Sequence, residues 1–600
     1  MASGLGALYS QLSRELSILH PDATLPAILA MSDYSTTHAR ATAESAFSER
    51  HQSHMATFLS YLAFWQDILD HCRSADVKQT LLDHFQILFL QQLLYPSLLQ
   101  SSDTDAGSSV AVLHYIDVML QSLEYPEIMN MMLRYLLAVQ DDAQVVSETP
   151  ITPTNPPRSP TALRRRESLI LLTAPKDPED AVEPILFSLV DLILNNINSQ
   201  NSQAVYAALK LGSTLLNRQK YFAFGTLLKV QRPSRDATLR TSGALESELE
   251  KLTELAVSLH EHDGLDDAYA ALAEDVRLNV EAQVLSLSAS QQSDRANKAT
   301  VGYHTLSSDD HLLKALRGLL RTFFTNSVDV NLALTQAIIS IAVCIEIRPD
   351  TWLAVDPSSY SFGDVPLVPQ REWQKYLEDE ETTTILALQN AAMRPSWSSD
   401  NAPLLYQTLQ ALAQELETVR ANVPTLDQLI AGRKTMLKAA NLSTPLMSTD
   451  DSFPIQSGFL DVHKPAQGNS RSLSRSSLTR GRNKAPNIGS PQSASLATSP
   501  VRKQALGDGV SSPSPINAMK SIFMPAPPEA PSTTDILMQQ LKFATDGQGQ
   551  ATEGDEQTIR TASLNHVLTN VVSLQEFVLE LVAVLQVRAS VLGEQEIRLI

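Results

Sequence analysis

Leucine-rich segments with an apolar residue at every third or fourth position recur along most of this 600-residue chain. That interval matches the 3.6-residue turn of an α-helix, so each segment is expected to bury one helical face. Glycine is scarce, at 21 residues, and alternating β-branched runs are rare, so hairpins and sheets have little support. The sequence therefore predicts an all-α fold.

The first part of the chain is expected to hold five helices. Their predicted ranges are 1–19, 55–72, 76–99, 110–123 and 126–139. In the second of these, Phe58, Leu62, Trp65 and Leu69 share one face, and the third is apolar on most sides and is expected to close near Pro96.

Further helices are expected at 184–195, 202–217, 245–260, 266–285, 378–393, 403–420 and 425–440, with a strongly apolar pair between Ser308 and Ile347. After a long polar stretch, helical periodicity returns at 535–543 and 558–592. The helices come in pairs but follow no fixed period, which favours an irregular α-solenoid of HEAT-like or armadillo-like helix pairs over a consensus repeat array.

Composition divides the chain into three parts. Residues 1–440 are expected to form the solenoid, with a disordered insertion near 140–166 that is rich in proline. Residues 441–533 are rich in Ser, Pro and Arg, lack the apolar side chains needed for a core, and are predicted to be a disordered linker. Residues 534–600 are expected to supply C-terminal helices that pack back on the solenoid.

The charge of the chain is strongly negative and unevenly placed. The net charge is -20, yet nine Lys and Arg residues face the single Asp508 between Lys464 and Lys520, so this segment carries +8 and the remainder -28. An acidic folded part lacks the basic surface that binding a phosphate backbone requires, so no nucleic acid is expected as a partner.

Cysteine usage and the N-terminal segment both favour a cytosolic location. Only Cys72 and Cys344 are present, which suits a reducing compartment. The N-terminal segment lacks the apolar core of a signal peptide, and the stretch 332–345, taken as the most apolar, contains Thr335 and Gln336, so no direct membrane span is predicted.

The sequence contains no P-loop, GxGxxG, GxSxG or HExxH motif, so no catalytic residue and no cofactor is assigned. The pairs His51 with His54 and His260 with His262 have spacings that a metal ion uses, but neither lies beside a cysteine or an ordered set of carboxylates, and no metal is expected. A single arginine that acts on the nucleotide of a bound GTPase requires no sequence motif, so the sequence leaves this activity open.

The last predicted helix carries a heptad-like seam. Apolar residues follow at alternating intervals of four and three, starting at Val567 and continuing through the candidate partner-binding residues Val571, Leu574, Val578, Leu581 and Leu585. A coiled-coil partner packs against such a seam, and so does a neighbouring helix of the same array. Both interpretations fit the spacing.

Candidate phosphorylation sites gather in the polar stretches. Five serines precede a proline and Ser168 follows two arginines; the six candidates are Ser159, Ser168, Ser490, Ser499, Ser512 and Ser514. Each phosphate adds close to two negative charges, so phosphorylation of the +8 segment would change its electrostatics strongly.

Four segments together resemble the FTS and Hook-interacting protein (FHIP) family. They are LLDHFQILFLQQLLYPSLLQ at 81–100, VAVLHYIDVML at 110–120, ESLILLT at 167–173 and SLQEFVLELVAVLQVRASVL at 573–592. The resemblance implies an α-solenoid that joins a Hook-type coiled-coil protein to an inactive ubiquitin-conjugating-enzyme variant of the FTS type.

In that family the assembly links early endosomes to dynein, and some members recognise an endosomal Rab GTPase. The resemblance therefore implies a non-enzymatic, cytoplasmic adaptor that is recruited to early endosomes. The alternative is a regulator of a Rab-type GTPase, acting as an exchange or activating factor.

The linker composition yields a first prediction. Deleting residues Gln467 to Pro528 should leave the melting temperature nearly unchanged, because the segment lacks the apolar residues that a core requires. Circular dichroism of the full chain and the deletion variant measures this. A marked loss of helical signal on deletion would show that the segment is structural.

Overall fold

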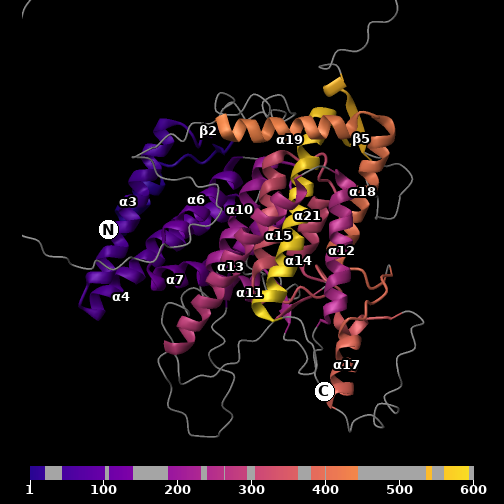
Figure 1. Ribbon diagram of the computed structural model, residues 1–600. Coiled ribbons are helices and arrows are strands. Elements are labelled where there is room, and N and C mark those ends of the chain that lie inside the picture. The colour runs from indigo at the N-terminus through magenta and orange to yellow at the C-terminus, as the bar shows by residue number, and fades with distance from the viewer. Residues whose placement is uncertain are drawn as a thin grey trace, which may run out of the picture. The chain divides into compact units, whose positions relative to one another are not determined.

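The computed structural model describes residues 1–19, 43–101, 107–139, 187–231, 240–261, 264–293, 304–307, 309–362, 380–398, 400–443, 536–543 and 560–593. All of them belong to one compact unit built from Met1–Ser457 and Thr533–Ile600. This part of the chain is mostly helical, which confirms the predicted all-α class (Figure 1). The predicted insertion at 140–166 and nearly all of the predicted linker lie outside the described residues.

The N-terminal helices are α1 (Ala2–Tyr9), α3 (Glu49–His71), α4 (Ala75–His84), the π-helical η3 (Phe85–Leu94), α5 (Tyr95–Gln100), α6 (Gly107–Ser122) and α7 (Pro126–Leu136). The predicted apolar face of α3 is buried along its whole length. Ser48 caps this helix by accepting a hydrogen bond from the His51 amide at 3.1 Å, so α3 begins earlier than its apolar pattern indicated.

The first and third predicted segments also end differently from the prediction. The first helix ends at Tyr9 rather than near residue 19; Ser10 follows as its C-terminal cap and donates its hydroxyl to the Gly6 carbonyl. Pro96 does not close the third segment; it lies in the first turn of α5, where a missing amide N–H costs little, and helix continues to Gln100.

The middle of the chain forms α9 (Leu189–Ile197), α10 (Ser202–Arg218), α11 (Lys220–Thr226), α12 (Ser242–Leu259), α13 (Leu265–Ser293), α14 (His311–Leu320) and α15 (Val328–Val343). Helix α10 packs against α6, α9 and α15, and so joins the N-terminal block to the rest. The expected acidic start of α14 is present, since the Asp310 carboxylate accepts the Leu313 amide at 2.7 Å.

The remaining helices are the short 3-10 turn η4 (Pro357–Ser359), α17 (Glu380–Ala391), α18 (Leu404–Asn422), α19 (Leu426–Ser443) and α21 (Leu564–Leu592). Three two-stranded pairs accompany them. They are the parallel pair β1 (Leu16–Ser17) with β2 (Glu44–Ser45) and the antiparallel pairs β3 (Val230–Gln231) with β4 (Thr305–Leu306) and β5 (Gln540–Phe543) with β6 (Arg560–Ser563).

The helix predicted at 535–543 is therefore wrong. Leu541 and Phe543 alternate with exposed residues along β5 and are buried, and the strand pairs with the residues that lead directly into α21. The segment is too short for helical periodicity to be distinguished from strand alternation by pattern alone.

Helix α21 lies among helices from the middle of the chain. It packs against α12, α13, α15 and α19, and Figure 1 shows it running between α12 and α15. In a regular solenoid each repeat contacts only its sequence neighbours. Here the last described helix instead completes a core whose other members lie more than a hundred residues earlier.

By length and composition, α21 is the helix of the described chain that could cross a bilayer, rather than the stretch 332–345. In the fold, however, 83% of its most apolar window is buried inside the protein. A helix at the centre of a helical core meets the same length and composition test.

A buried ion-pair network fixes the segment after α15 to α12. Arg240 Nε lies 2.9 Å from Glu248 Oε2 and its Nη2 lies 2.7 Å from Asp350 Oδ1, while Arg348 Nε approaches Asp350 Oδ2 at 2.6 Å. Burial raises the pKa of the Glu248 carboxyl, and Arg240 opposes that shift. Removing one member would leave a buried charge without its counterion.

Two imidazole rings meet in the core of the N-terminal block. His51 of α3 and His114 of α6 have ring centroids 6.4 Å apart, and Tyr115 stacks on His51 at 5.9 Å. His51 is 2% exposed, and neither of its ring nitrogens has a hydrogen-bond partner among the described residues. Burial lowers the pKa of both rings, to about 3 for His114, where His51 and Lys210 add to the effect; near His51, Glu44 opposes the shift and His54 adds to it.

These histidines should make the protein sensitive to acid. Below the unfolded pKa of 6.5, the unfolded chain takes up protons that the buried rings refuse, so stability falls as pH drops from 6.5 toward 3. We expect His114→Gln to remove about 1 to 2 kcal/mol of the loss between pH 7 and pH 5. Urea denaturation at each pH measures it.

The matched control is His84→Gln, which makes the same substitution at an exposed histidine on α4. If the variant with both His51→Gln and His114→Gln loses as much stability between pH 7 and pH 5 as the wild type, the acid sensitivity comes from other groups.

Candidate functional site

The five candidate partner-binding residues of α21 are all buried. Val571, Leu574, Val578 and Leu581 are 0% exposed and Leu585 is 2% exposed. Their heptad-like seam packs against α12, α13, α15 and α19 instead of facing solvent. The interpretation of this seam as a partner surface is therefore corrected, because its apolar face is already covered within the fold; the alternative, that it closes the helical array, agrees with the packing.

Polar side chains interrupt this apolar helix where it passes the ends of other helices. Asn570 Nδ2 donates to the carbonyls of Phe323 and Asn326, each at 3.2 Å, and His566 Nε2 lies 2.7 Å from the Asn326 carbonyl. These carbonyls lie in the turn beyond the C-terminus of α14, and the Phe323 carbonyl also accepts the Asn331 side-chain amide at 2.7 Å. Two side chains of α21 thus satisfy the turn that follows α14.

Arg588 does the same at the end of α15. Its side chain is fully buried, and Nη1 donates to the carbonyls of Ala342 at 2.8 Å and Cys344 at 2.7 Å, while Nη2 donates to Ile347 at 2.8 Å. A cation at a helix C-terminus also interacts favourably with the helix dipole. The guanidinium therefore offsets part of its burial cost through three hydrogen bonds and this field.

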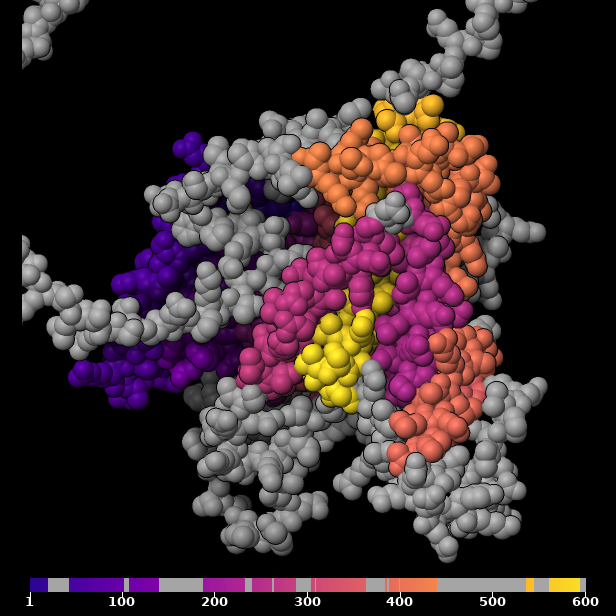
Figure 2. All heavy atoms as spheres, in the orientation of Figure 1, coloured from indigo at the N-terminus to yellow at the C-terminus, as the bar shows by residue number. Residues whose placement is uncertain are grey.

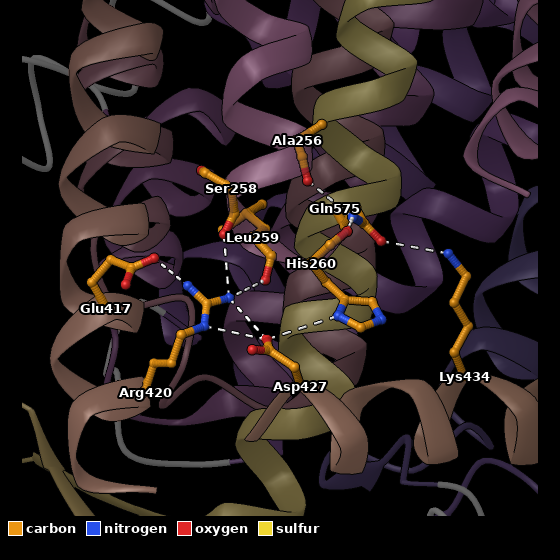
Figure 3. Close-up of polar contacts among 9 residues, drawn as sticks. All are labelled: Ala256, Ser258, Leu259, His260, Glu417, Arg420, Asp427, Lys434 and Gln575. Carbon is orange, nitrogen blue, oxygen red and sulfur yellow. Dashed lines mark hydrogen bonds and ion pairs between the residues drawn. The ribbon is translucent and has the colours of Figure 1, made fainter. Parts of the chain in front are cut away.

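Gln575 reaches the end of α12. Figure 3 shows its side chain between the carbonyls of α12 and Lys434 of α19. Gln575 Nε2 donates to the Ala256 carbonyl at 2.9 Å and also to the His260 carbonyl, and Gln575 Oε1 accepts from Lys434 Nζ at 3.4 Å. One amide thereby links α12, α19 and α21.

Arg420 of α18 also contacts the C-terminal end of α12 (Figure 3). Its Nη2 donates to the Leu259 carbonyl at 3.0 Å and to Asp427 Oδ1 at 3.0 Å, and His260 Nδ1 lies 3.9 Å from that same carboxylate oxygen. These contacts join the ends of α12 and α18 to the start of α19. We call this group, Arg420, Asp427, His260 and the Leu259 carbonyl, the clasp; its contacts are structural.

The histidine pairs and the candidate phosphorylation sites lie partly within and partly outside the described residues. His51 faces His114 rather than His54, and His260 lies in the clasp, while His262 falls outside the described residues. Within the described ranges, no group of three or more His, Cys, Asp and Glu side chains is arranged to hold a metal ion. Ser159, Ser168, Ser490, Ser499, Ser512 and Ser514 all lie outside the described residues.

The solvent-facing side of α21 is acidic. Glu576 is exposed, and Figure 2 shows part of α21, in yellow, at the surface between α13 and α12. The pKa of Glu580 is raised to about 7, chiefly by burial and also by the nearby carboxylates of Asp275 on α13 and Glu576. The acidic side chains Glu576 and Glu580 lie between the seam positions, which the heptad pattern did not single out.

Comparison with known proteins identifies the N-terminal part. Residues 1–229 match the family described as RAI16-like, Retinoic acid induced 16-like protein. The matched region runs from α1 to the turn after α11 and so includes the N-terminal block and α10. No curated protein and no solved structure matches the chain. The chain thus carries a RAI16-like region in its first 229 residues.

The buried seam predicts a large loss of stability on charge insertion. Leu585→Asp should lower the free energy of unfolding by more than about 3 kcal/mol, because it removes buried apolar contacts and places a carboxylate at a position that is 2% exposed. Thermal and urea denaturation measure the loss.

Leu332→Asp on α15 is the control, since Leu332 is 53% exposed and the same substitution there should change stability by less than about 0.5 kcal/mol. Equal melting of the two variants would contradict the burial of this seam.

Proposed function

We propose that this chain is a non-enzymatic adaptor of an FTS–Hook–FHIP type complex that links early endosomes to dynein for microtubule-based transport. The observation that carries the proposal is the RAI16-like match over residues 1–229, because the FHIP domain is of this type. The partners are a Hook-type coiled-coil protein, an inactive ubiquitin-conjugating-enzyme variant of the FTS type and an endosomal Rab GTPase. The protein is cytoplasmic and is recruited to early endosomes.

The helical architecture supports an adaptor. Stacked helices offer long exposed faces on which several proteins bind at once, while the core holds those faces in fixed positions. Here α21 ties α12, α13, α15 and α19 together, so the faces on their outer sides are held rigidly. Rigid faces bind with a smaller loss of conformational entropy than mobile ones.

Affinity purification of the full chain from cells, followed by mass spectrometry, tests the proposal. A Hook-type protein and a ubiquitin-conjugating-enzyme variant should be the most enriched proteins, and Leu585→Asp should reduce both because it unfolds the scaffold. Leu332→Asp is the control for the substitution itself. Absence of both partners from the wild-type sample would overturn the proposal.

A nucleotide-turnover assay with a panel of Rab proteins separates the adaptor from the alternative regulator. An adaptor binds a GTP-loaded Rab without changing its rates of GTP hydrolysis or nucleotide exchange. Acceleration of either rate by the purified chain would replace the proposal with a regulator of a Rab-type GTPase.

A further inference from the structure

The outer side of α13 carries a regular stripe of apolar and acidic residues. Successive positions along it are separated by four and three residues, and the stripe consists of Asp267, Ala271, Glu274, Leu278, Glu281 and Leu285. Leu278 is 44% exposed and Leu285 is 69% exposed. Figure 2 shows α13 at the surface beside the visible part of α21. The apolar members repeat every seven residues, as do the acidic members.

A seven-residue repeat on an exposed helix matches a second helix lying alongside it. Apolar residues spaced by seven stay on one side of a helix as it winds about a neighbour, which is how helices pack in a coiled coil. The buried side of α13 packs against α21, where the Tyr269 hydroxyl donates to Gln586. The exposed stripe has the spacing that a further helix would need in order to pack against the outer side of α13.

The charges around the stripe define that helix. Helix α13 contains five acidic residues and one basic residue, Arg277, for a net charge of -4. Arg277 is held by Glu274 and Glu281, each at 2.6 Å, so its charge is already matched within the stripe. Asp275 of the same helix and Glu576 of α21 lie close to Glu580 and add negative charge beside this face.

These charges favour one kind of occupant. A second copy of the same face would place acidic residues against acidic residues, which is unfavourable. Lysine or arginine residues that flank a leucine stripe would instead neutralise the acids while the leucines cover Leu278 and its neighbours. We propose that the outer face of α13 binds a basic amphipathic α-helix of a partner protein.

This inference deepens the proposed adaptor function, since it assigns a surface and a partner chemistry to it. The probe is a synthetic four-heptad helix with leucine at alternating intervals of three and four residues and lysine at the flanking positions. A second peptide replaces each lysine with glutamate. Binding of both to the full chain is measured by fluorescence anisotropy at low and physiological salt.

The lysine peptide should bind with an affinity that falls as salt rises, and the glutamate peptide should not bind. Leu278→Asp should weaken lysine-peptide binding at least tenfold, although it adds a negative charge that simple electrostatic attraction would favour. Leu99→Asp on α5 is the matched control, because Leu99 is 42% exposed, and it should change binding less than twofold.

Equal effects of Leu278→Asp and Leu99→Asp, or equal binding of both peptides, would overturn the inference. Sedimentation of the chain without peptide tests the other occupant: a dimer that Leu278→Asp dissociates would assign the face to a second copy and overturn it as well. If Leu278→Asp lowers the melting temperature, Leu278→Gln takes its place. If both peptides bind equally while the Hook-type partner still co-purifies with the chain, this inference alone is rejected. If that partner is absent from the wild-type sample while the lysine peptide binds as expected, the adaptor function alone is rejected.

Discussion

Hydrogen bonds from buried side chains of α21 to the ends of three other helices hold the described core together. The last carbonyls of a helix have no donor within their own helix, and an unpaired buried carbonyl costs about 1 to 3 kcal/mol. In the middle of a helical array water cannot satisfy them. Gln575 and Arg588 supply such donors at the ends of α12 and α15, and Asn570 donates to carbonyls in the turn that follows α14.

These contacts also fix how α21 lies in its groove. An apolar seam alone packs almost equally well after a shift of one heptad, because leucine and valine repeat along it. The three polar side chains each meet carbonyls at one place only, so a shift would leave donors and acceptors unpaired at three helix ends. The apolar residues drive burial, and the polar residues select a single register.

The same polar residues explain why a helix apolar enough to cross a bilayer belongs in this protein core. In hydrocarbon, the guanidinium of Arg588 would lose the carbonyls of Ala342, Cys344 and Ile347 that accept its hydrogen bonds here. With the seam of α21 committed to the core, the partners proposed for this chain would meet outward faces such as that of α13.

Local pattern in the sequence determined the all-α class and most helices, because amphipathic spacing needs only nearby residues, as in α3 and α10. It failed where a distant strand decided the outcome, as in β5, which pairs with β6. For the heptad seam of α21, the spacing left two interpretations open, since burial in the same chain and binding to another chain require identical residues. Only the tertiary structure decided between them, because exposure depends on which helices, hundreds of residues away, arrive beside the seam.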